Sequence, residues 1–175
     1  MGLAEALRDW HDFYVLGGTA SATLIGLMFV AASIGASYFE EKNAAGLRLF
    51  LTPTVVHFSA ILITCLLVTV PTHTWTSFGA LLLAASVIGI AYSAWVAIDM
   101  KRRRFYDTVD IFDRLWYALT PMAGYFIVMI AACGLMAQRR GSLDLLAAGL
   151  GVLLLLGLRN AWDMTVWVVI RSPNR

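Results

Sequence analysis

The residues best suited to chemistry stand inside the last long apolar stretch of the chain, residues 142–172. They are Arg159, Asn160 and Asp163. Charged side chains are costly in hydrocarbon and are therefore functional candidates when they occur there. Arg159 and Asp163 are four residues apart, so they share a helical face and can pair, and Asn160 widens this polar patch. We expect all three side chains to lie among packed helices and away from lipid tails.

Three interpretations of this patch remain open. An Arg159–Asp163 pair packed between helices could simply fix the register of the last helix. Alternatively, the span could end at Leu158, and Arg159 would then extend its charge to the headgroup region. In the third interpretation the patch lines a pore or binds a solute. Arg159 would then attract anions, or Asp163 would carry a proton or a cation.

His57 is the second candidate, because it lies inside another apolar stretch and shares a helical face with Thr64. An intramembrane imidazole could relay protons or bind a metal, and the alternative is a hydrogen-bonded packing residue. The other two histidines, His11 and His73, are predicted to lie near the outer side of the membrane. The sequence has no Cys–His or Glu–His pairing of the kind that is typical of zinc or iron sites, so we predict no metal and no cofactor.

These residues must be positioned by membrane-spanning helices. The chain is 60% hydrophobic and 14% charged, whereas soluble domains have about 25% charged residues. Continuous apolar runs of about 20 residues predict helices that cross a bilayer about 30 Å thick, and the runs do not alternate as barrel strands do. We therefore predict an all-α, polytopic single transmembrane domain over residues 1–175, whose first run is a retained span. The five predicted spans are residues 13–39, 51–70, 75–98, 117–137 and 143–170.

The connections between these spans are short or amphipathic. Residues 71–74 and 138–142 predict two hairpins, one of spans two and three and one of spans four and five. Residues 105–116 place apolar side chains at helical spacing and predict an interfacial amphipathic helix between spans three and four. Just before it stands the basic run of Lys101, Arg102, Arg103 and Arg104. This run fits recognition of anionic headgroups and fits topology marking equally well.

The first span carries small residues at every fourth position, namely Gly18, Ala22 and Gly26. This spacing lets two helix backbones approach closely, either within one chain or between two copies. Leu3 and Leu7 precede the span and share a face with its first aromatic residues. They predict a short amphipathic segment at the N-terminus.

The distribution of Lys and Arg predicts the orientation. With five spans, nine of these residues lie on one side of the membrane and three on the other, and Arg159 lies within the last span. Because basic residues concentrate in cytoplasmic loops, the N-terminus is predicted outside and the C-terminus in the cytoplasm.

Residues 10–30 contain two motifs, W-x-x-F-Y starting at Trp10 and T-L-x-G-L-x-F-V ending at Val30. This opening resembles that of a broad set of short bacterial inner-membrane proteins. The resemblance covers about 25 residues and implies a bacterial inner-membrane setting. It supplies no activity and no site residues.

Several functional classes are disfavoured by what the sequence contains. It has no nucleophile elbow, P-loop, H-E-x-x-H or dinucleotide fingerprint, so we predict that it is not an enzyme. The formal charge of +2, with its basic residues clustered, argues against a nucleic-acid partner.

The remaining prediction is a homo-oligomeric channel or transport protein for an ion or a small solute. Its path would be lined by polar side chains of the second and fifth spans: His57, Thr64, Arg159, Asn160 and Asp163. An odd number of spans without an inverted repeat favours a channel over an alternating-access carrier. The alternative is a non-catalytic accessory subunit that binds another membrane protein or anionic lipid.

Overall fold

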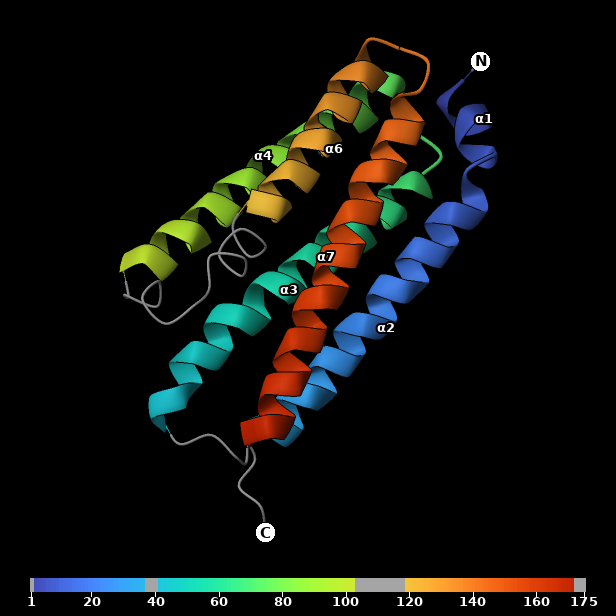
Figure 1. Ribbon diagram of the computed structural model, residues 1–175. Helices are drawn as coiled ribbons and strands as arrows, with labels where there is room; N and C mark the ends of the chain where they lie inside the picture. The colour runs from blue at the N-terminus through green and yellow to red at the C-terminus, as the bar shows by residue number, and fades with distance from the viewer. Residues whose placement is uncertain (1, 37–40, 103–118, 172–175) are drawn as a thin grey trace.

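The computed structural model describes residues 2–36, 41–102 and 119–171, and every regular element in these ranges is a helix (Figure 1). The predicted all-α class is therefore confirmed. The described helices, in chain order, are α1 (Leu3–Arg8), α2 (His11–Ala36), α3 (Glu41–Val68), α4 (Trp75–Arg102), α6 (Thr120–Met136) and α7 (Ser142–Arg171).

Three of these helices contain stretches that are long and apolar enough to cross a membrane, by length and composition. They are His11–Ser33 in α2, Trp75–Asp99 in α4 and Ser142–Asp163 in α7. The described residues also contain two shorter apolar stretches, Thr52–Val68 and Thr120–Met136. Each of the five overlaps one predicted span, although the first and last stretches end six and seven residues before the predicted ends, and α3 begins ten residues before the predicted start at residue 51.

The interfacial helix predicted at residues 105–116 lies outside the described residues. Lys101 and Arg102 form the last residues of α4, and Arg102 is exposed. Arg103 and Arg104 also lie outside the described ranges, so the basic run is placed only in its first half.

Short polar motifs set the ends of the helices. Before α4, the Ser77 N–H donates to Thr74 Oγ1 at 3.1 Å, and the Thr74 N–H donates to Ser77 Oγ at 2.9 Å. This reciprocal cap satisfies backbone donors that a helix start would leave unpaired. Between α6 and α7, Gly141 has a φ of 81°, and the Ser142 hydroxyl donates to the Arg139 carbonyl at 2.9 Å. A left-handed residue at this place lets the chain reverse within a few residues.

The helices form two neighbouring groups that share α7. On one side α4 lies along α6, and α6 lies along α7. On the other side α3 packs against α2 and α7 (Figure 1). The predicted connection between α3 and α4 is indeed a tight turn, but the two helices diverge from it. Each finds its main partner elsewhere, which the turn alone did not indicate.

Glycines bring the α4, α6 and α7 backbones together. A Cβ built on Gly89 of α4 would overlap the Tyr125 ring of α6, and one on Gly124 of α6 would lie 2.7 Å from Leu153 Cδ2 of α7. Large side chains fill the space between the helices and are completely or almost completely buried, among them Phe58, Phe78, Leu82, Leu135, Leu146 and Leu153. The middle of the described bundle is therefore packed.

Candidate functional site

The polar patch on α7 divides into a half-exposed pair and a buried amide. Arg159 Nε lies 3.7 Å from Asp163 Oδ2, which confirms that the two residues can pair along one helix face. Their side chains are 36% and 40% exposed, so the pair is only partly covered by the rest of the described chain. Arg159 and Asp163 are therefore less enclosed by neighbouring helices than we expected. A continuously apolar helix gave no sign of which side faces inward.

Asn160 meets that expectation, because it is only 1% exposed. It follows Gly157 by three residues and so points to the same side of α7, where Gly157 lies against the ring of Phe58 on α3. Its Oδ1 accepts no hydrogen bond from any residue that the structure describes. A buried oxygen left unpaired costs about 1–3 kcal/mol, which a water or ligand donor at the α3–α7 contact would recover.

His57 is 1% exposed and hydrogen-bonded to a partner on another helix. Its Nδ1 lies 3.0 Å from the Tyr125 hydroxyl of α6, and the two rings are tilted with centroids 5.6 Å apart. Gly89 of α4 faces the same tyrosine ring, so three helices meet here. This geometry supports the interpretation of His57 as a hydrogen-bonded packing residue. Tyr125 was missed in the sequence because nothing in its apolar stretch indicates a contact with residue 57.

Thr64 also lies on the buried face that it was predicted to share with His57. Its hydroxyl donates to the Ala60 carbonyl of its own helix at 2.9 Å. It is therefore turned to the α3 backbone and not to a partner on another helix. Among the described residues, no group of three or more His, Cys, Asp or Glu side chains could hold a metal ion.

The small residues of α2 separate into two kinds. A Cβ built on Gly18 would lie 3.2 Å from Cys65 Cβ, so this glycine supports close packing of α2 on α3. Ala22 is exposed, and a Cβ on Gly26 would meet nothing within 4 Å. The predicted close approach is thus found within the chain at Gly18, and beyond it the small-residue face is open.

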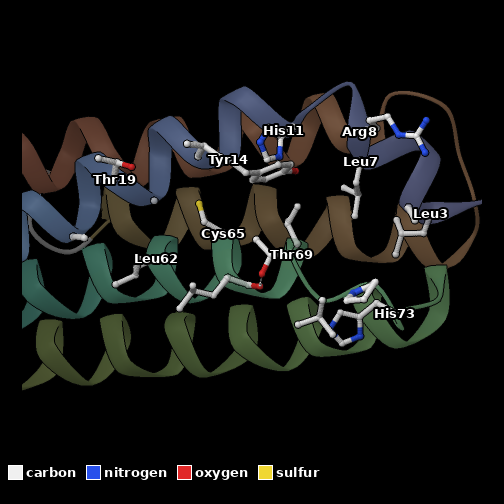
Figure 2. Close-up of a pocket in the computed structure, with 18 residues that line it drawn as sticks. Leu3, Leu7, Arg8, His11, Tyr14, Thr19, Leu62, Cys65, Thr69 and His73 are labelled. Atoms are coloured by element: carbon white, nitrogen blue, oxygen red, sulfur yellow. Dashed lines mark hydrogen bonds between the residues drawn. The ribbon is translucent and has the colours of Figure 1, made fainter.

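A groove begins where this packing ends. This groove of about 670 Å³ lies between α2 and the second half of α3 and is bounded by α1 and by the turn before α4 (Figure 2). Leu3 and Leu7 of α1 are buried, as the predicted amphipathic segment requires. Sequence reasoning missed the groove, because its walls come from segments some 50 residues apart.

The chain matches no family model, no curated protein and no solved structure. Its function is therefore inferred from its own residues.

Proposed function

We propose that the chain is an integral membrane protein of the bacterial inner membrane whose five apolar helices α2, α3, α4, α6 and α7 all cross the bilayer. The stretch Thr120–Met136 has 17 residues, which at 1.5 Å per residue is about 25 Å. That is slightly shorter than the hydrocarbon layer, and helices can accommodate such a mismatch by local thinning of the bilayer. The balance of Lys and Arg then favours an outside N-terminus and a cytoplasmic C-terminus.

Within this membrane setting, we propose that copies of the chain assemble and conduct an ion or a small solute. The observation that carries the proposal is the half-exposed Arg159–Asp163 pair on a membrane-spanning helix. Because the middle of the described bundle is packed with large side chains, a path through the protomer would have no room. A path between copies would instead be lined by α7, and the pair would face water there in place of lipid tails.

Flux measurements in liposomes test this proposal. We expect Asp163→Asn and Arg159→Gln either to abolish ion flux or to change its ion selectivity, because each variant removes one charge from the proposed path. Asp144→Asn is the matched control, since Asp144 is exposed in the first turn of the same helix. The exchange of the two charges, Arg159→Asp with Asp163→Arg, keeps a pair and should alter ion selectivity.

Two results would contradict conduction. One is a strict monomer in detergent and in nanodiscs by light scattering. The other is wild-type liposomes that pass neither ions nor small solutes. An accessory subunit is the second candidate function, and the open small-residue face at Ala22 and Gly26 favours it, because such faces accept a partner helix. Co-purification of one fixed membrane protein with silent liposomes would support that function.

A further inference from the structure

The groove between α2 and α3 combines apolar walls with polar groups at one end. Its walls are formed by Val15, Gly18 and Ala22 of α2 and by Leu62 and Leu66 of α3. From His11 to Ala22 it follows α2 for eleven residues, or about 16 Å. Its volume of about 670 Å³ falls within the usual range of pockets for small organic ligands.

The polar end of the groove carries hydrogen-bond donors without protein partners. Tyr14 is 2% exposed and lines the groove, and its hydroxyl has no partner among the described residues. His73 Nε2 is likewise buried and unpartnered in the described structure. Figure 2 shows Tyr14 and His11 on α2, with His73 on the facing turn and Arg8 at the end of α1. Both residues line the groove and both atoms are closed to solvent, so a small movement of these two side chains would let an occupant of the groove pair with them.

Of the charged side chains that the structure describes, Arg8 is the one that lines the groove, and it is positive. The lining also includes His11 and His73, whose imidazole N–H groups are further donors. Glu5 and Asp9 flank Arg8 in the sequence but do not line the groove. Arginine and imidazole N–H groups are suited to phosphate oxygens, since a guanidinium can donate two parallel hydrogen bonds.

We infer that this groove binds an anionic phospholipid, with one acyl chain between α2 and α3 and the phosphate at Arg8, His11 and His73. The polar end coincides with the beginning of the apolar α2 stretch and the end of the apolar α3 stretch. Headgroups of the surrounding bilayer lie at that level. The acyl chain then occupies the apolar part of the groove down to Ala22, and the Tyr14 hydroxyl donates to an ester or phosphate oxygen of the lipid. This inference does not depend on conduction.

Lipid retention tests the acyl-chain part of the inference. The protein is reconstituted with equal amounts of phosphatidylglycerol and phosphatidylcholine of identical acyl chains, and bound lipid is counted by native mass spectrometry. Ala22→Trp fills the groove and should abolish the retained phosphatidylglycerol. Ala31→Trp is the matched control, because Ala31 is exposed on the same helix and does not line the groove. It should retain lipid as the wild type does.

The headgroup part is tested at Arg8, which is exposed and can be changed without disturbing the core. Arg8→Gln should lower the preference for phosphatidylglycerol over phosphatidylcholine about fivefold, the effect expected of one cation near a membrane surface. Arg140→Gln is the control, because Arg140 lies in the connection between α6 and α7 and does not line the groove, so this variant should keep the wild-type lipid preference. Equal retention of both lipids by the wild type would overturn the inference. Retention of phosphatidylglycerol by Ala22→Trp would also overturn it. If this variant dissociated a dimer and left lipid retention unchanged, the groove would be an interface between two copies of the chain.

Discussion

Small residues line two helix contacts in this protein, and the two contacts differ in how completely they are filled. Between α4 and α6, Gly89 receives the Tyr125 ring. Between α2 and α3, Gly18 meets Cys65, but the space beside Ala22 stays open and becomes the groove. The buried share is 28% in the apolar stretch of α4 and 11% in that of α2. A small residue therefore permits close packing, and the side chain opposite decides whether packing or a cavity results.

The largest expected effect would break the filled contact. Gly89→Leu forces a side chain into the space of the Tyr125 ring and should destabilise the protein by about 3 kcal/mol, the upper end of ordinary overpacking. The matched control is Gly26→Leu, because Gly26 is exposed and a Cβ there meets nothing within 4 Å. Thermal unfolding in one detergent checks both variants. Equal melting temperatures would contradict the distinction between filled and open contacts.

A smaller effect should follow from the hydrogen bond inside the filled contact. Tyr125→Phe keeps the ring that fills the space at Gly89 and removes the hydroxyl that meets His57 Nδ1. We expect a loss of about 1 kcal/mol, because buried hydrogen bonds between membrane helices contribute modestly. Chemical denaturation measures the change. If liposome flux also fell while stability did not, His57 would have a functional role beyond packing.

The smallest effect on stability is expected at the surface of α7. Asp163→Asn breaks an ion pair whose side chains are 36% and 40% exposed, and half-exposed pairs contribute about 0.5 kcal/mol or less. The variant should therefore unfold almost as the wild type does. A loss of several kcal/mol would instead mean that the pair fixes the position of α7, and the proposed path would lose its main support.

The sequence predicted where the helices are far better than which faces meet. Apolar length located all five stretches, with starts within three residues and ends within seven residues of the apolar limits, since a bilayer demands about 20 apolar residues whatever their order. Pairing was not predictable at Tyr125 or along the groove, because a helix that is apolar all round has no distinct inward face. The i, i+4 relation of Arg159 and Asp163 is local and was predicted. Their exposure depends on the neighbours of α7 and was not.

The short connection between α6 and α7 bears on how the chain enters the bilayer. Residues 137–141 separate the two helices, and five residues reach at most about 18 Å, well short of the hydrocarbon thickness. In the proposed five-span arrangement, the connection is therefore too short to cross the bilayer, and the end of α6 cannot lie on the opposite surface from the start of α7. The end of α6 and the start of α7 then lie at the same membrane surface, and the two helices cross the bilayer in opposite directions. The orientation of α6 therefore fixes the side on which the last residues of the chain emerge.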